Sequence, residues 1–194
     1  MFQKIWLVLF CGLILAAFSA RAFGGDDMAK KKKKKKITAA AQVAPSTGEN
    51  PRIKFETSKG SFTVELFSDV PISTKNFVDL AVKGFYDGLT FHRYVSGFVI
   101  QGGDPTGTGG GGSGKTIPLE ITAHKHLKGA LGMARTNDPN SATSQFYICL
   151  DDTPNLDGGY TVFGQVIVGM DNVMELRQGD TMTKVTLLKG DAEK

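Results

Sequence analysis

The sequence FHRYVSGFVIQGGD at Phe91–Asp104 decides how this chain is interpreted, because it sets Arg93 and Gln101 among large apolar residues. Its pattern predicts two short strands, near residues 90–95 and 97–102. An arginine guanidinium is always protonated and offers several donors in one plane. No obvious nucleophile, acid–base pair or metal-ligand cluster accompanies these residues. The stretch therefore suits a reaction that breaks no covalent bond.

Two downstream segments continue this pattern: GALGMAR at residues 129–135 and SQFYICL at residues 144–150. Successive side chains of an extended strand point to opposite faces. Gln145 and Tyr147 should then point one way, and Phe146 and Ile148 the other. We expect one face of this strand to line a groove and the other to enter the protein core.

The rest of the chain alternates with the period of a strand or repeats with that of a helix. Pro71 opens a helix in which Phe77, Leu80 and Ala81 are spaced three and four apart, and Gly84 ends it. Further strands are predicted near residues 53–56, 61–66, 129–135, 144–150, 161–168 and 183–188, with a second short helix over 171–177. Many short strands with two separated helices favour an antiparallel barrel, since closure removes exposed strand edges.

Length and charge indicate one globular domain that does not bind nucleic acid. The chain has 194 residues and a formal net charge of +4. From Pro51 onward, however, 14 basic and 16 acidic residues leave a net charge of about −2. The excess of positive charge belongs to the N-terminal segment. A nucleic-acid-binding domain normally carries basic residues on the fold itself.

The N-terminal 22 residues have the pattern of a secretory signal peptide. Lys4 precedes the apolar run Ile5–Phe18, and Ala20-Arg21-Ala22 supplies the small residues of a cleavage site. The run is shorter than the ~20 residues that span a membrane comfortably. We therefore expect an exported protein, periplasmic or secreted. Alternatively, Met28 is the true start and the protein is cytoplasmic.

Residues 23–50 are predicted to be a flexible linker before a domain at residues 51–194. The linker contains the run Lys30–Lys36, and a block of like charges stays solvated. This run is either a soluble spacer or a contact for an acidic surface. It also opposes export, since positive charge close behind an apolar segment tends to remain cytoplasmic.

Three other features have simple structural explanations: a cysteine, a glycine-rich segment and a pair of histidines. Removal of Cys11 with the leader leaves Cys149 without a partner, and we expect it to be a small buried hydrophobe. The segment GGGGSGKT at residues 109–116 fits a phosphate-binding loop, but no apolar strand precedes it and Pro118 follows it. His124 and His126 lack an evident third ligand, so no metal site is predicted.

Taken together, these motifs resemble the cyclophilins, the cyclosporin-binding class of peptidyl-prolyl cis-trans isomerases. The resemblance covers Arg52 to Leu188 and rests on FHRYVSGFVIQGGDPTGTGGGGSG, GALGMAR, SQFYICL and NLDGGYTVFGQV, in family order. The short connection between Gly114 and Gly129 is similar to the compact forms of the family. The resemblance implies a mainly β fold: a closed eight-stranded antiparallel barrel capped by two α-helices, with a substrate groove on its outer face.

The resemblance also implies the site residues. Arg93 matches the catalytic arginine, and Gln101 is placed to orient it. The substrate-binding positions are Phe98, Val99, Met133, Ala134, Gln145, Tyr147, Leu156 and Tyr160. Three of these depart from the commoner residues: Val99 stands for methionine, Tyr147 for phenylalanine and Tyr160 for histidine. Asn155 replaces a tryptophan that helps to bind cyclosporin, so we expect weaker cyclosporin binding.

The expected function is isomerisation of X–Pro bonds during protein folding, on unfolded or flexible proline-containing polypeptides. No cofactor is expected, and we expect a monomer. A non-catalytic proline-recognising chaperone or binding module is the alternative from a different class. A third interpretation makes the lysine run the main functional element, with the barrel as its cargo.

Overall fold

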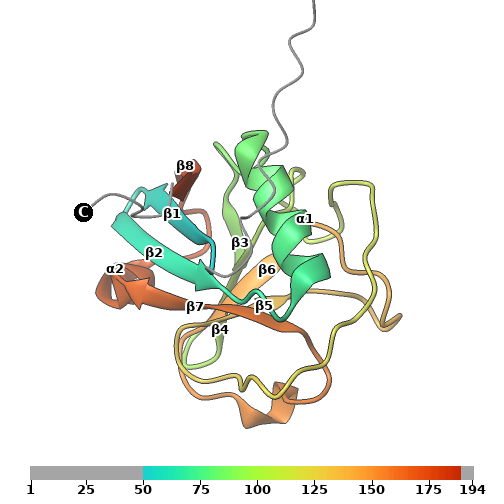
Figure 1. Ribbon diagram of the computed structural model, residues 1–194. Coiled ribbons are helices and arrows are strands. Elements are labelled where there is room, and N and C mark those ends of the chain that lie inside the picture. The colour runs from blue at the N-terminus through green and yellow to red at the C-terminus, as the bar shows by residue number, and fades with distance from the viewer. Residues whose placement is uncertain (1–49, 189–194) are drawn as a thin grey trace, which may run out of the picture. The chain divides into compact units, whose positions relative to one another are not determined.

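The computed structural model describes residues 50–188, which form one mainly β unit (Figure 1). The predicted signal peptide, most of the predicted linker and the lysine run lie outside these residues. No helix within the described range is long and apolar enough to cross a membrane.

Eight antiparallel strands and two α-helices make up the fold, as the sequence predicts. The strands are β1 (Arg52–Thr57), β2 (Gly60–Leu66), β3 (Phe91–Val95), β4 (Val99–Gly102), β5 (Ala130–Met133), β6 (Phe146–Cys149), β7 (Val162–Val168) and β8 (Met182–Leu188). The helices are α1 (Pro71–Val82) and α2 (Met170–Glu175), and a 3-10 turn, η1, covers Pro154–Leu156. The strand order in the sheet is β3-β4-β6-β5-β7-β2-β1-β8.

The prediction of a closed barrel is wrong, because the sheet stays open between β3 and β8. These edge strands share no ladder, and only the isolated bridge between Thr90 and Thr181 lies at the seam. The backbone N–H of Phe91 donates to Asp180 O at 2.9 Å, and that of Met182 donates to Leu89 O at 2.8 Å. Each edge strand thus faces the turn that precedes the other strand. The offset leaves a half-barrel.

Helix α1 begins at Pro71, where a proline costs no backbone hydrogen bond. The Glu120 carboxylate accepts from the backbone N–H groups of Ile72 and Ser73 at 3.0 and 2.7 Å. It therefore satisfies donors that the helix itself leaves free. The helix ends just before Gly84, which has a positive φ of 69°. Both predicted limits of this helix are confirmed.

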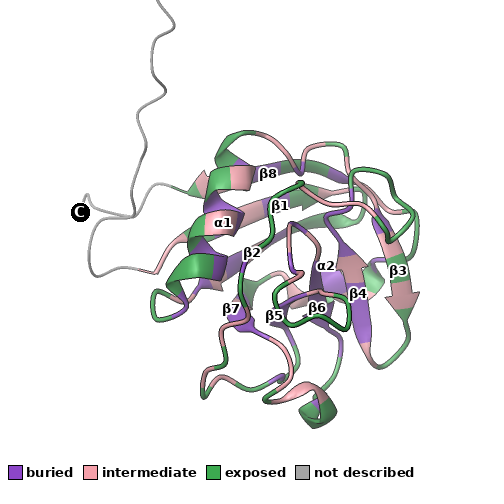
Figure 2. Cartoon of the chain, turned by 90° about the vertical axis from the view of Figure 1, so that its right-hand side faces the viewer, coloured by how far each residue is buried: buried purple, intermediate pink, exposed green. Residues whose placement is uncertain are grey.

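The buried apolar residues form two clusters, one inside the half-barrel and one on the opposite side of its sheet. The larger cluster contains the fully buried rings of Phe55, Phe62, Phe77, Tyr86, Phe91, Phe146 and Phe163. The smaller one consists of Val99, Ala130, Tyr147, Cys149 and Val162. Figure 2 shows that buried positions dominate β4, β5 and β6, whereas β3 is largely intermediate or exposed. Phe146 and Tyr147 fall into different clusters, which confirms the predicted alternation.

Candidate functional site

Sheet pairing brings Arg93, Gln101 and Gln145 together although they are far apart in the sequence. Arg93 on β3 lies opposite Gln101 on β4, and Gln101 lies opposite Tyr147 on β6. The Arg93 guanidinium donates to Gln101 Oε1 at 3.2 Å. Gln101 Nε2 in turn donates to Gln145 Oε1 at 2.9 Å. Among residues 50–188 no carboxylate forms an ion pair with Arg93, so its positive charge is held by a neutral amide.

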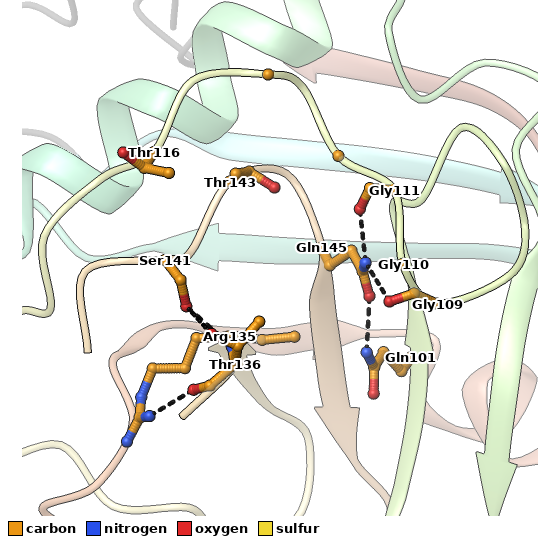
Figure 3. A pocket seen from close by; sticks show the side chains of 13 residues that line it. Gln101, Gly109, Gly110, Gly111, Thr116, Arg135, Thr136, Ser141, Thr143 and Gln145 are labelled. Atoms are coloured by element: carbon orange, nitrogen blue, oxygen red, sulfur yellow. Dashed lines mark hydrogen bonds between the residues drawn. The ribbon is translucent and has the colours of Figure 1, made fainter. Parts of the chain in front are cut away.

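A glycine loop fixes the direction of this chain of amides. Gln145 Nε2 donates to Gly109 O at 2.9 Å and to Gly111 O at 2.7 Å (Figure 3). Carbonyl oxygens only accept, so the NH2 group of Gln145 must face the loop. Its oxygen then faces Gln101, whose own oxygen is left to face Arg93. The loop therefore sets which end of each amide meets the guanidinium.

Asp104 holds the glycine loop from inside. Its side chain is buried, and its carboxylate accepts from the backbone N–H groups of Thr106, Thr108, Gly109 and Gly111 at 2.6–3.1 Å. Burial raises the pKa of Asp104, but these donors and the Thr106 hydroxyl outweigh it and hold the pKa at about 2. The sequence predicted only a glycine loop beside the groove. An aspartate just before a Thr/Gly-rich turn is the signal that would have revealed its anchor.

Asp104 should make the protein sensitive to acid. Its folded pKa of about 2 lies below the ~3.9 of an unfolded aspartate, so its stabilisation is full above about pH 4. That stabilisation, about 2 kcal/mol, should be lost as the pH falls through 4 towards 2. We expect urea unfolding of Asp104→Asn to depend less on pH over this range than that of the wild type.

A matched control for that change is Asp79→Asn, because Asp79 pairs with Lys75 at the surface, 2.8 Å away. This variant should keep the pH dependence of the wild type. Equal acid sensitivity of the Asp104 variant and the wild type would contradict the assigned role of the buried carboxylate.

The apolar residues of the predicted groove gather around Tyr147 in the smaller cluster. Val99 and Tyr147 are buried members of it, and the partly buried residues that pack against it include four predicted groove residues: Phe98, Ala134, Leu156 and Tyr160. The Tyr147 and Tyr160 rings meet edge to face, with centroids 6.2 Å apart. Met133, by contrast, is buried in the larger cluster inside the half-barrel. The structure thus brings together every predicted apolar groove residue except Met133.

A cavity of about 390 Å³ adjoins the amide chain. Gln101, Gln145 and the glycine loop form one side of it, and Ala134, Arg135 and four hydroxyl side chains complete the lining: Thr116, Thr136, Ser141 and Thr143 (Figure 3). The sequence did not predict this cavity, because its hydroxyl residues come from two separate loops, the β4–β5 and β5–β6 connections.

Arg135 packs against Tyr160, one of the residues around the smaller apolar cluster. Its guanidinium lies over the Tyr160 ring, 4.5 Å from the centroid, and donates to Gly159 O at 2.7 Å. A second bond runs from Nη1 to Thr136 O at 2.7 Å. These contacts engage the guanidinium with backbone carbonyls and an aromatic face. Arg135 therefore differs from Arg93, whose hydrogen bond goes to a side-chain amide.

The two histidines considered as metal ligands have other partners. His124 Nε2 lies 3.0 Å from Asp69 Oδ1. His126 is buried, with Nδ1 2.9 Å from Asp157 Oδ1 and Nε2 2.9 Å from the Tyr147 hydroxyl. Within residues 50–188 no group of three His, Cys, Asp or Glu side chains is arranged to hold a metal ion. No sequence motif indicates that His126 contacts Tyr147, which was predicted to line the groove.

Tyr147 and Cys149 on strand β6 are shielded from ionisation. Burial raises the pKa of the Tyr147 phenol well above its usual value. Burial also raises the pKa of the Cys149 thiol, which lies 3.3 Å from the Thr153 hydroxyl. Cys149 is therefore the buried hydrophobe that was predicted, and Tyr147 meets the groove as a neutral ring.

Comparison with known sequences gives one consistent family. The family model described as cyclophilin type peptidyl-prolyl cis-trans isomerase matches residues 52–191. A peptidyl-prolyl cis-trans isomerase of Synechococcus elongatus is 46% identical over 136 residues, covering 69% of this chain and 93% of the relative. One from Helicobacter pylori is 44% identical over 135 residues, covering 67% and 82%.

Solved structures agree with the sequences. A cyclophilin type peptidyl-prolyl cis-trans isomerase from Cryptosporidium parvum matches with a TM-score of 0.68 and 31% identity, covering 72% of this chain and 98% of that one. The same Cryptosporidium parvum protein, crystallised in the presence of the dipeptide Ala-Pro, matches with a TM-score of 0.66 and 32% identity, covering 71% and 99%. These relatives are named as isomerases, which does not favour a non-catalytic binding module. The chain therefore belongs to the cyclophilin-type peptidyl-prolyl cis-trans isomerase family, and prolyl isomerisation is its function.

Proposed function

We propose that isomerisation takes place on the face of the sheet that carries Arg93, with proline-containing polypeptides as substrates. Amide resonance sets a barrier of ~18–20 kcal/mol to rotation about the X–Pro bond. Rotation out of the plane breaks this resonance and leaves a lone pair on the prolyl nitrogen. A guanidinium N–H that donates to that lone pair stabilises the twisted state more than either planar state. We assign this donor to Arg93.

Gln101 keeps the guanidinium in place for this task. Its oxygen accepts one Arg93 N–H at 3.2 Å, which leaves the other donors for a substrate. The observation that carries the proposal is this pairing with a neutral amide. A carboxylate partner would compete with the substrate for the donors and neutralise the charge. An amide orients the guanidinium without cancelling it.

The smaller apolar cluster supplies a pocket for the proline ring in this proposal. Phe98, Val99, Tyr147 and Leu156 provide apolar surface, with Ala134 and Tyr160 at its margin. The glycine loop engages both N–H groups of Gln145, so its Oε1, which also accepts from Gln101, is the atom left to contact the peptide. Holding the ring while the preceding carbonyl rotates favours the twisted geometry. The Cryptosporidium parvum relative, whose crystal structure was determined in the presence of Ala-Pro, supports proline-containing peptides as ligands.

A proline-peptide assay tests the proposal. Uncatalysed exchange takes tens to hundreds of seconds at 25 °C, so acceleration by a small amount of protein is easily measured. We expect cis-to-trans conversion of an Ala-Pro peptide to speed up in proportion to protein concentration. A protein that binds the peptide without changing the rate would support the chaperone alternative instead.

Cyclosporin should bind weakly to this protein. Asn155 is exposed in the 3-10 turn η1, where cyclosporin-binding relatives carry the indole of a tryptophan. An indole offers a large apolar surface that asparagine lacks, although both side chains carry N–H donors. We expect Asn155→Trp to raise cyclosporin affinity about tenfold in a direct titration, equivalent to ~1.4 kcal/mol. Equal affinity of the two proteins would contradict this prediction.

We further propose that the protein is exported and acts on chains that fold beyond the cytoplasmic membrane. The support is the apolar run Ile5–Phe18 followed by Ala20-Arg21-Ala22. Sequencing the N-terminus of the native protein tests this, and a first residue near Ala29 would refute it.

In this proposal Lys30–Lys36 contacts an acidic surface. Deletion of the run should remove salt-sensitive binding to such a surface without changing isomerase activity.

A further inference from the structure

His126 connects two segments that contribute residues to the smaller apolar cluster, Tyr147 and Leu156. Its Nε2 lies 2.9 Å from the hydroxyl of Tyr147, on strand β6. Its Nδ1 lies 2.9 Å from Oδ1 of Asp157, which directly follows η1 and its Leu156. The imidazole is completely buried. One side chain therefore bonds to Tyr147 and to the segment that carries Leu156.

The Asp157 end of this connection is firmly held. Asp157 Oδ1 also accepts from the backbone N–H of His126 at 2.9 Å. This backbone bond, the imidazole and Lys125 together lower the pKa of Asp157 to about 2, so it is ionised at neutral pH. In addition, the backbone N–H of Thr153 donates to His126 O at 2.7 Å. The segment 153–157 is thereby attached to His126 at both ends.

The hydrogen bonds determine where the imidazole proton resides. A carboxylate only accepts, so the proton of neutral His126 must be on Nδ1, facing Asp157. Nε2 is then an acceptor, and the Tyr147 hydroxyl donates to it. Each polar atom in this row has a partner of the right kind. Loss of one member would leave another without its hydrogen bond.

The Tyr147 ring also has little freedom on its other side. Gly132 lies directly opposite Tyr147 in the β5–β6 pairing, and a Cβ at this position would overlap the phenol. The ring lies nearly parallel to the His126 imidazole, with an interplanar angle of 14° and centroids 6.0 Å apart. The hydroxyl bond to His126 therefore decides how far the ring extends into the groove.

We propose that His126 is a positioning residue that sets the spacing of the proline pocket, by tying Tyr147 to the segment that carries Leu156. The inference rests on the proposed function, since it takes these two residues as walls of the pocket. A pocket of fixed spacing accepts the five-membered ring of proline and discriminates against the larger six-membered ring of pipecolic acid. His126 thus acts on ring selectivity without touching the substrate.

The experiment compares kcat/KM for an Ala-Pro peptide and an Ala-pipecolyl peptide. The ratio of the two values is unaffected by a loss of folded protein, so it separates positioning from a purely structural role. We expect His126→Leu to lower the preference for proline about tenfold, the size of effect that one methylene produces in a fitted pocket. Tyr147→Phe breaks only the hydroxyl bond and should lower the ratio in the same direction.

Matched variants sharpen the comparison. Lys125→Ala removes an exposed contact to the other oxygen of Asp157, at 3.3 Å, and leaves both His126 bonds intact. This variant should keep the ratio of the wild type. The double variant His126→Leu/Tyr147→Phe should resemble His126→Leu alone, because both changes break the same link. Should His126→Leu fail to fold, Tyr147→Phe still provides the test.

An unchanged ratio in both variants of an active enzyme would overturn the inference. An imidazole nitrogen NMR spectrum gives an independent test, and a proton on Nε2 instead of Nδ1 would overturn the inference whether or not the protein is active. A wild type that does not accelerate exchange would refute the proposed function instead, so the two failures are distinguishable.

Discussion

Replacement of Arg93 by alanine is expected to lower kcat/KM for an Ala-Pro peptide about 100-fold, the usual cost of removing a donor that acts on the transition state. The loss should fall mainly on kcat. The apolar pocket remains to bind the proline ring, while the guanidinium serves the twisted amide. Peptide exchange rates measured at several substrate concentrations give both constants.

Two further variants make this result specific. Arg93→Lys keeps the positive charge but removes the planar, multi-donor group that Gln101 orients, and should recover only a small part of the rate. Arg52→Ala removes another exposed arginine, which donates to Glu65 at 3.2 Å, and should leave the rate unchanged. Full activity of Arg93→Ala would exclude the guanidinium as the donor, and with it the proposed mechanism.

Gly132→Ala is expected to have the second largest effect, because the new methyl group would occupy the space of the Tyr147 phenol. The ring has to move into the groove, or the strands have to separate. Overpacking of this kind costs about 1–3 kcal/mol of stability. We expect a fall of about 10- to 100-fold in kcat/KM, since small displacements of a positioning group are costly.

The control for this change is Gly159→Ala, where a new Cβ would approach only Leu156 O, at 3.5 Å. This variant should remain as stable and as active as the wild type. Thermal unfolding and peptide exchange measured on both variants separate the crowding effect from a general intolerance of alanine. A Gly132→Ala protein with normal activity would show that the Tyr147 ring can move without disturbing the pocket.

The sequence predicted that Gln101 orients Arg93, but not the bond from Gln101 to Gln145 or what fixes the direction of this chain of amides. Arg93, Gln101 and Gln145 occur in recognisable motifs, and the strand period places them on one face. The role of Asp104 depends on how a loop folds around one carboxylate. Loop backbone geometry of this kind has no periodic signature in a sequence. The contact of His126 with Tyr147 joins residues 21 positions apart and is likewise set by tertiary packing.

Two predictions failed for reasons that lie in the strands themselves. Met133 was assigned to the groove, yet it is buried inside with Leu131. The preceding Gly132 has no side chain to indicate which face of β5 is outside, so the strand phase was easily misjudged. Closure failed because it depends on the offset between β3 and β8. The hydrophobic pattern of each strand says nothing about that offset.

The open seam has a consequence for how the enzyme fails under heat. Strand β3 carries Arg93 and forms its ladder with β4 alone. Edge segments fray at temperatures at which a packed interior is still intact. Warming should therefore displace the guanidinium while the apolar pocket persists. Turnover would disappear several degrees before the fold melts, and cooling would restore it without any need for refolding.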